Sequence, residues 1–277
     1  MKSRTRKQIL TGLRYLAIIT GAVVVLFPIY LMLTTSLKPR VAAFAIPPEW
    51  TFVPTLSSYA TVLFDDNFLR FFSNSVQVAL GATVGSVLIA ALAAYGIVRF
   101  RFKGSQVFVG GTLVLKMIPE VILVVPVFLL WNAFGLINTR IGLILVYVAL
   151  NLAFNIWIIR AFMMEVPREL EQSAEIDGCS ELTIFSRIIM PLIAPGLSVA
   201  AIFTFRLAWN EFVLSLALTN RFTRTLPVAV SMYITDVGVQ WGPITAIATV
   251  IALPAFIFTF LAARSLISGL TAGAVKG

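Results

Sequence analysis

The chain has 277 residues, of which 59% are hydrophobic and only 12% are charged. Soluble domains carry about 45–50% apolar and about 25% charged residues, so a water-soluble fold of this size could not cover so much apolar surface, and an integral membrane protein is predicted. The sequence contains no histidine, and Cys179 is its one cysteine, which excludes intrachain disulfides, His/Cys zinc sites and catalysis by a histidine base. We expect no metal site. We attribute the net charge of +9 to cytoplasmic Lys and Arg rather than to nucleic-acid binding.

Six apolar stretches are long enough to cross a bilayer core, which takes about 20 residues of helix. They lie near residues 13–37, 71–98, 107–131, 141–162, 197–218 and 244–267. The predicted fold is therefore an all-α membrane protein with six transmembrane helices. Residues 1–12 form a cytoplasmic N-terminus, and residues 13–277 form a single transmembrane domain. Pro119 and Pro126 interrupt the third stretch and can bend it.

A cleaved signal peptide is the alternative interpretation of the first stretch, because Ala43 and Ala45 offer an A-x-A pattern. The apolar run is nearer to about 20 residues than to the 7–15 of a signal sequence. Lys38 and Arg40 also separate it from the cleavage pattern. These features favour an uncleaved helix.

The basic residues predict the orientation. If the N-terminus is cytoplasmic, the basic N-terminal segment, the turn at 99–103, the loop at 163–196 and the C-terminal end all lie on the cytoplasmic side. This arrangement places most Lys and Arg inside, so the positive-inside rule predicts that both termini are cytoplasmic. Residues 38–70 would then form a small extracytoplasmic cap.

The loop at 163–196 has features of a docking element. Six of the 12 acidic residues fall within Glu165–Glu181. Pro167 suits the first position of a helix and Gly178 suits the left-handed position after the last turn, so a helix is predicted near 167–177. Ser180 can cap a second helix. A helix–glycine–helix elbow of this kind suits binding by a partner, although a solvated surface elbow is the alternative.

This segment resembles the EAA loop of binding-protein-dependent ABC importer permeases, whose pattern is E-A-A-x-x-x-D-G. The three positions of the name are Gln172, Ser173 and Ala174, followed by Asp177 and Gly178 and by two later prolines. The glutamate and the first alanine of the pattern are therefore replaced.

Two further stretches are similar to the carbohydrate-importer branch of these permeases, the MalG type. They are the Trp209–Phe212 motif and the ending Gly269–Gly277. The resemblance implies a type I ABC importer permease fold with a cytoplasmic coupling helix, located in the bacterial inner membrane. It also implies alternating-access import of an oligosaccharide, disaccharide or polyol.

The resemblance implies a division of labour among several chains. The expected partners are a second, homologous permease, two ATPase subunits, an extracytoplasmic solute-binding protein and membrane lipid, without nucleic acid. No Walker A pattern occurs in the sequence. We therefore expect no enzymatic activity and no cofactor in this chain, with ATP and Mg²⁺ bound by the partner subunits.

The resemblance also assigns residues to the contact with the ATPase. The expected coupling residues are Glu171, Gln172, Ala174, Asp177 and Gly178. Glu171 could substitute for the missing glutamate. The expected contacts of the cytoplasmic tail, residues 268–277, are Gly269, Gly273 and Lys276.

Polar side chains within the apolar stretches are candidates for a translocation path, because such groups are costly in lipid and usually face protein or water. The candidates are Arg206, Asn210, Glu211, Asn151 and Asn155. Interhelical hydrogen bonding, typically worth about 0.6–2 kcal/mol, is the alternative role. Lys116 and Glu120 are four residues apart and are expected to neutralise each other.

Three rival functions remain open. A permease of another ABC branch, for glycerol-phosphate, amino acids or phosphate, would lack the sugar-type motif and tail. A secondary transporter would show inverted repeats or a second half, which the sequence does not reveal. A membrane-embedded enzyme would need paired carboxylates, and Glu120 and Glu211 do not have such spacing.

Overall fold

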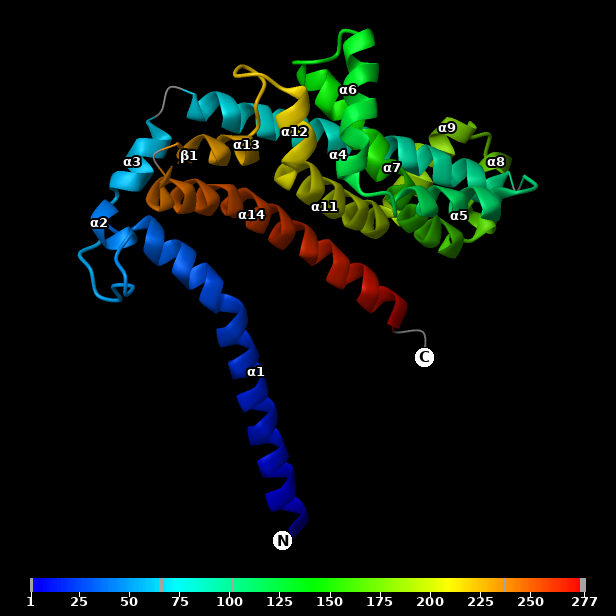
Figure 1. The fold of residues 1–277 in the computed structure, drawn as a ribbon. Helices are drawn as coiled ribbons and strands as arrows, with labels where there is room; N and C mark the ends of the chain where they lie inside the picture. Colours follow the sequence, from blue (N-terminus) through cyan, green and yellow to red (C-terminus); the bar gives the residue numbers. More distant parts are fainter. Residues whose placement is uncertain (1, 65–66, 101, 237, 275–277) are drawn as a thin grey trace. The chain divides into compact units, whose positions relative to one another are not determined.

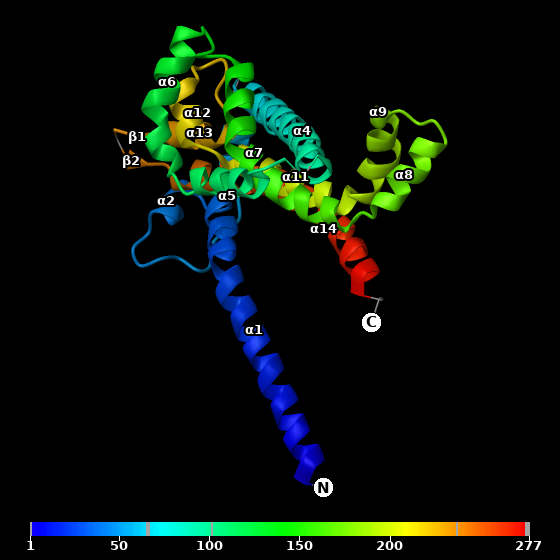
Figure 2. The same cartoon turned by 90° about the vertical axis from the view of Figure 1, so that its right-hand side faces the viewer.

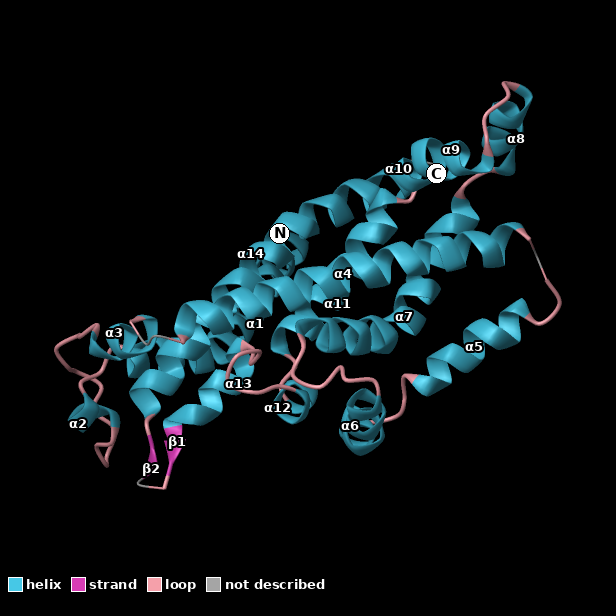
Figure 3. Ribbon diagram, turned by 90° about the horizontal axis from the view of Figure 1, so that it is seen from above, coloured by secondary structure: helices cyan, strands magenta, loops and turns pink. Residues whose placement is uncertain are grey.

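The computed structural model describes residues 2–64, 67–100, 102–236 and 238–274, and most of them are helical (Figure 3). The long helices are α1 (Lys2–Ser36), α4 (Phe68–Arg99), α7 (Arg140–Glu165), α11 (Ala194–Asn210) and α14 (Trp241–Ala274). The described strands, β1 (Ile234–Thr235) and β2 (Gly238–Val239), form one antiparallel hairpin in which Ile234 pairs with Val239. The chain divides into two compact units, residues 1–66 with 230–251 and residues 67–229 with 252–277.

The first unit contains α1, α2 (Arg40–Ala43), α3 (Ser57–Leu63), the hairpin and the beginning of α14. The hydroxyls of Ser36 and Tyr59 share a hydrogen bond of 2.8 Å that joins the end of α1 to α3. Val62 of α3 and Ile247 of α14 are buried. In contrast, the side chains at residues 10–28 of α1 are exposed, as expected for an apolar helix that contacts lipid or another subunit.

The second unit is built on α4, α7 and α11, which lie side by side (Figure 1). Gly81 and Gly85 lie on the face of α4 that contacts α7. A Cβ atom at Gly81 would lie 2.8 Å from Cδ1 of Ile144, and one at Gly85 would lie 3.1 Å from Cγ2 of Val148. The two glycines therefore permit a helix approach that larger residues would prevent.

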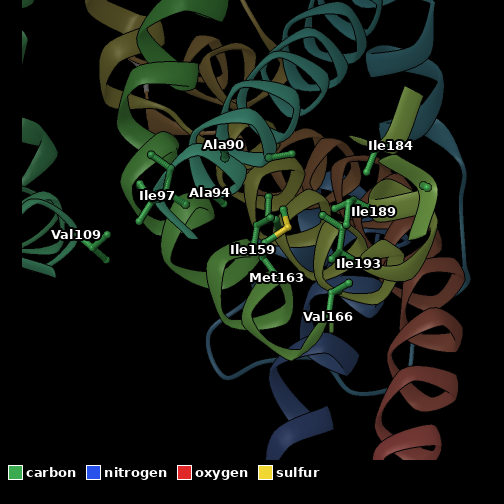
Figure 4. Packing of buried hydrophobic residues seen from close by; sticks show 14 residues of the cluster. Ala90, Ala94, Ile97, Val109, Ile159, Met163, Val166, Ile184, Ile189 and Ile193 are labelled. Atoms are coloured by element: carbon green, nitrogen blue, oxygen red, sulfur yellow. The ribbon is translucent and has the colours of Figure 1, made fainter. Parts of the chain in front are cut away.

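An apolar cluster fills the end of this unit beside the loop at 163–196. Figure 4 shows Ile159 and Met163 of α7 directed toward Ile189 and Ile193, all of which are fully buried. Ala174, from the predicted coupling helix, belongs to the same cluster. The elbow is thus attached to the helices of the second unit through buried apolar surface.

The third apolar stretch is divided between helices, which corrects the prediction of one continuous span at 107–131. α5 (Ser105–Leu115) ends before Pro119, and η1 (Glu120–Leu123) and α6 (Val124–Ala133) follow it. The break follows from proline, which cannot donate its backbone nitrogen to a helix and disfavours helical geometry in the preceding residue. Lys116 and Glu120 form the expected ion pair, with 3.4 Å between Nζ and Oε1.

The fifth stretch, predicted at 197–218, is also discontinuous. α11 ends at Asn210, and α12 (Val213–Leu218) follows after an extended residue, Glu211. Before α11, the helical segments Glu181–Leu192 and Ala194–Asn210 are bent by 76°.

By length and composition, four described helices can cross a membrane, or five if this bent pair is one span. The four helical segments are Leu10–Ser36, Phe68–Arg99, Arg140–Glu165 and Trp241–Phe260, and the apolar segments Ser105–Val114 and Glu120–Ala133 are shorter. The helix α13 (Leu226–Val230) and the turn η3 (Ser231–Tyr233) connect α12 to the hairpin.

Candidate functional site

The loop at 163–196 forms the predicted elbow. α8 (Arg168–Ile176) and α9 (Glu181–Ile184) are joined by a tight turn, and the π-helix η2 (Phe185–Ile189) and α10 (Met190–Leu192) continue the chain. Gly178 has a φ of +79°, the left-handed conformation that glycine adopts without steric cost. Ser180 caps α9 by accepting a hydrogen bond of 3.4 Å from the backbone N–H of Thr183. Figure 2 shows α8 and α9 as a hairpin beyond the ends of α4 and α7.

The inner face of α8 is held to the end of α4 by a buried ion pair. The guanidinium of Arg99 contacts the carboxylate of Glu171, and each side chain is only 9% exposed. The hydroxyl of Tyr95 donates a longer hydrogen bond of 3.4 Å to Oε2 of Glu171. Because water is excluded from the Arg99–Glu171 pair, loss of one partner destabilises the protein far more than it would in a surface ion pair.

Two hydrogen bonds to backbone carbonyls strengthen the same attachment. Nη2 of Arg99 donates to the carbonyl of Val166, just before α8, at 3.2 Å. Nη2 of Arg168, the first residue of α8, donates to the carbonyl of Arg99, at the end of α4, at 2.6 Å. The two arginines therefore connect the end of α4 and the beginning of α8 in both directions.

The outer face of the elbow is exposed and combines acidic with large apolar side chains. Ile176 is 87% exposed and Leu182 is 73% exposed. The other exposed residues of the elbow include Asp177 and Gly178, which follow Ile176 directly, and Gln172, Glu175 and Glu181, which line a pocket with Tyr95 and Arg99. Exposed apolar groups with a polar surround are typical of a protein interaction site.

The predicted coupling residues thus divide between two faces. Gln172, Asp177 and Gly178 lie on the exposed face, whereas Glu171 and Ala174 are each 7% exposed and face inward. The structure corrects the expectation of an exposed Glu171, because its carboxylate is buried and paired with Arg99 of the same chain.

Sequence reasoning missed Arg99, Tyr95 and Arg168, which position the elbow. Only weak patterns in the sequence could have indicated them. Arg99 lies in the last turn of an apolar helix, and Glu171 shares the inward face of an amphipathic helix with Ala174. Neither pattern specifies a partner so distant in the sequence.

The polar residues of the spans also divide by burial. Asn155 is fully buried, and its amide donates to Oγ of Ser86 at 2.8 Å and to Oγ1 of Thr204 at 2.7 Å, which joins α7 to α4 and α11. Asn151 is 4% exposed and donates to the carbonyl of Tyr147 in its own helix at 2.8 Å. Asn155 therefore joins three helices, as expected of interhelical hydrogen bonding, whereas the bond of Asn151 stays within α7.

Glu211 has a structural role as well. Its carboxylate accepts hydrogen bonds from the backbone N–H groups of Leu214 and Ser215, at 2.7 and 2.9 Å, and from the hydroxyl of Tyr147 at 2.5 Å. It therefore caps α12 at the break after α11. Arg206 and Asn210 differ from it, because both are exposed and lie four residues apart on one face of α11.

The predicted tail contacts are described only in part. Gly269 and Gly273 lie within α14, whereas Lys276 lies outside the described residues.

Comparison with known families identifies most of the second unit. Residues 86–270 match the family described as "Binding-protein-dependent transport system inner membrane component". The match includes the elbow, α11 and most of α14.

Curated relatives match over nearly the whole chain. The diacetylchitobiose uptake system permease protein DasC of Streptomyces coelicolor is 36% identical over 91% of this chain and 92% of its own length. The trehalose transport system permease protein SugB of Mycobacterium tuberculosis is 36% identical over 91% and 93%, respectively. The trehalose/maltose transport system permease protein MalG of Thermococcus litoralis is 34% identical over 92% and 93%.

Solved structures show the same fold. A chain of a bacterial ABC transporter involved in the import of the acidic polysaccharide alginate superposes with a TM-score of 0.77 at 21% identity, over 93% of this chain and 96% of that one. A chain of the MetNI methionine ABC transporter, in inward-facing conformations, gives a TM-score of 0.57 at 14% identity, over 73% and 95%.

Proposed function

Since the chain belongs to the family of binding-protein-dependent transport system inner membrane components, and is thus a permease subunit of an ABC importer, we propose that the α8–α9 elbow couples it to partner ATPase subunits. In this role the exposed outer face of the elbow contacts an ATPase. The buried inner face, held by Arg99 and Glu171, transmits the movement of the ATPase to α4 and α7. Such rigid attachment suits a rigid-body transition between two states.

The observation that carries this proposal is the exposed pair Ile176 and Leu182 on a helix hairpin that is otherwise firmly attached. A large apolar side chain that is 87% exposed gains free energy from burial, about 25 cal/mol for each Å² of apolar surface removed from water. The exposed carboxylate of Asp177, which follows Ile176 directly, favours a basic partner surface.

The proposed substrate is a carbohydrate, which the chain moves by alternating access. Relatives that cover almost the whole chain are named for diacetylchitobiose, trehalose and maltose transport. Arg206 and Asn210 are the proposed contacts along the path, because they share an exposed face of α11 and present groups that can hydrogen-bond sugar hydroxyls.

The assembly proposed around this chain follows the same logic. It comprises a second, homologous permease, two ATPase subunits that bind ATP and Mg²⁺, and an extracytoplasmic solute-binding protein. The absence of a Walker A pattern from the sequence supports placing hydrolysis on the partner chains. The distribution of basic residues supports cytoplasmic termini in an inner membrane, with the tail, including Gly269, Gly273 and Lys276, on the side of the ATPases.

The first experiment is co-purification from the native membrane with an affinity tag at the N-terminus, which leaves the C-terminal tail free. We expect mass spectrometry to identify a second permease and an ATPase. We also expect the eluate to hydrolyse ATP faster when the sugar and its binding protein are added. A stable chain that purifies alone after mild solubilisation and crosslinking, and that takes up substrate in response to an ion gradient, would refute the proposal in favour of a secondary transporter.

The second experiment tests the elbow itself with a photocrosslinking amino acid at Ile176. We expect a crosslink to the ATPase. The matched control is the same amino acid at Val53, which is 81% exposed in the segment predicted to be extracytoplasmic. The control should react with the solute-binding protein and not with the ATPase. An ATPase crosslink from Val53 but not from Ile176 would invert the proposed topology and refute the role of the elbow.

A further inference from the structure

A cavity of about 540 Å³ lies in the second unit, beside the attachment of the elbow. Three arginines line it, Arg99 from α4, Arg160 from α7 and Arg168 from α8, and one acidic residue, Glu169, also lines it. The charge of Arg99 is balanced by Glu171. Neither Arg160 nor Arg168 forms an ion pair with a carboxylate of the described residues. The cavity therefore has an excess of positive charge.

Arg160 is the residue that most requires a ligand. Its Nε is buried and has no hydrogen-bond partner among the residues that the structure describes. A buried charged donor without an acceptor is costly, so native structures normally supply one. Arg168 donates only to backbone carbonyls, those of Val98 and Arg99. Arg168 also lines a neighbouring pocket that contains Glu171, Glu175 and Glu181, so its charge is shared between the two pockets, and Arg160 is the main cationic group of the cavity.

Two helix N-termini open on the same cavity. The first residues of α5, Ser105 and Gln106, line one side, and the beginning of α8, at Pro167 and Arg168, lines the other. Neither helix has a side-chain cap, although the N–H of Ser105, the first residue of α5, already donates to the carbonyl of Phe102 at 3.2 Å. Uncapped helix N-termini bind phosphate through the N–H groups of their first turn and through the positive end of the helix dipole.

From this combination we infer that the cavity binds the phosphate of an anionic phospholipid headgroup, with Arg160 as its principal ligand. The surroundings favour a lipid over a free phosphate. Met164 lines the cavity and is 58% exposed, and Phe102, Val107 and Phe108, which are close in sequence to lining residues of α5, are 48%, 80% and 51% exposed. Exposed apolar side chains beside a basic pocket suit acyl chains beside a headgroup.

The assembled importer, reconstituted in nanodiscs, provides the test. The probe is phosphatidylglycerol with a photoreactive group near the headgroup, and the labelled peptides are mapped by mass spectrometry. We expect labelling of the segments around residues 97–108 and 160–169 in the unmodified protein. Arg160→Gln should lower this labelling about five-fold, the effect of one basic contact with an anionic lipid. Arg160→Lys, which keeps the charge, should retain most of it.

Two controls make the outcome specific. Arg187→Gln removes an exposed arginine of η2 that does not line the cavity, and it should leave the labelling unchanged. A phosphatidylcholine probe contains the same phosphate but also a choline cation, which the arginines of the cavity repel, so it should label these segments much less than phosphatidylglycerol does. Equal labelling of Arg160→Gln and of the unmodified protein, in variants that still assemble with the ATPase, would overturn the inference. Competition by inorganic phosphate that is as effective as competition by a soluble short-chain phosphatidylglycerol would overturn the assignment to a lipid.

Discussion

Removal of one partner from the Arg99–Glu171 pair should release the elbow from α4. Glu171→Gln keeps the shape of the side chain but leaves the guanidinium of Arg99 buried without its counter-ion. Both side chains are 9% exposed, so the value for breaking a buried pair, about 3–5 kcal/mol, applies rather than the 0–1 kcal/mol of a surface pair. The contacts of Ala174 and Val166 with the apolar cluster remain, so the elbow should open locally while the rest of the unit stays folded.

Hydrogen exchange of the backbone amides of α8 in the assembled transporter measures this effect. A loss of 3–5 kcal/mol corresponds to exchange that is roughly 100- to 4,000-fold faster, since each 1.4 kcal/mol is a factor of ten. We also expect fewer sugar molecules transported per ATP hydrolysed. The ATPase should still turn over, because its own active sites are unchanged. Glu165→Gln, which removes an exposed carboxylate at the end of α7, outside both the ion pair and the outer face of the elbow, is the control and should change neither quantity.

A double variant separates the ion pair from a general effect of mutation. Arg99→Met with Glu171→Leu removes both charges together, and replacing a buried pair by apolar residues is often neutral. The double variant should therefore exchange more slowly than either of its components alone, Arg99→Met or Glu171→Leu. Two results would refute the role assigned to this pair. One is an amide exchange rate in α8 that Glu171→Gln leaves unchanged. The other is a free-energy cost of the double variant that equals the sum of the costs of its two single variants.

Other substitutions should distinguish docking from packing. At Gly178, a Cβ atom would meet nothing within 4 Å, so Gly178→Ala should lower the free energy of unfolding only through its left-handed backbone, by about 1–2 kcal/mol. Gly178→Arg should abolish uptake, because the arginine blocks the partner. Unimpaired uptake by the arginine variant would contradict docking. Asn155→Leu should lower the free energy of unfolding by about 1–3 kcal/mol, which thermal unfolding measures, because two interhelical hydrogen bonds are lost. Sugar selectivity in competition uptake should not change. An altered selectivity would indicate that Asn155 lines the translocation path. Asn210→Ala should change stability by less than about 0.5 kcal/mol but raise the KM for the sugar, and an unchanged KM would remove it from the path. Glu211→Ala should destabilise the protein by about 1–2 kcal/mol through the lost cap of α12, and an unchanged unfolding temperature would contradict that role.

Local features of the fold were predictable because their causes are local. The long apolar stretches became helices, since a helix satisfies its backbone hydrogen bonds within one segment and can therefore enter lipid. The elbow followed from Pro167, Gly178 and Ser180, which act on the dihedral angles and N–H groups of their immediate neighbours. The interruption at Pro119 was foreseen as a bend, but its strength was underestimated, because the chain leaves the helix there altogether.

The sequence by itself therefore determined the membrane character, most of the helices and the position of the elbow. Which way each polar side chain faces was decided only by the tertiary structure. Asn155 and Asn210 are the same residue type in neighbouring apolar stretches, yet one is fully buried among hydroxyls and the other is exposed. Glu171 was expected to meet another protein, and it meets Arg99 of the same chain instead. Burial and pairing depend on which helices pack together, and periodicity within one segment contains no information about the neighbour.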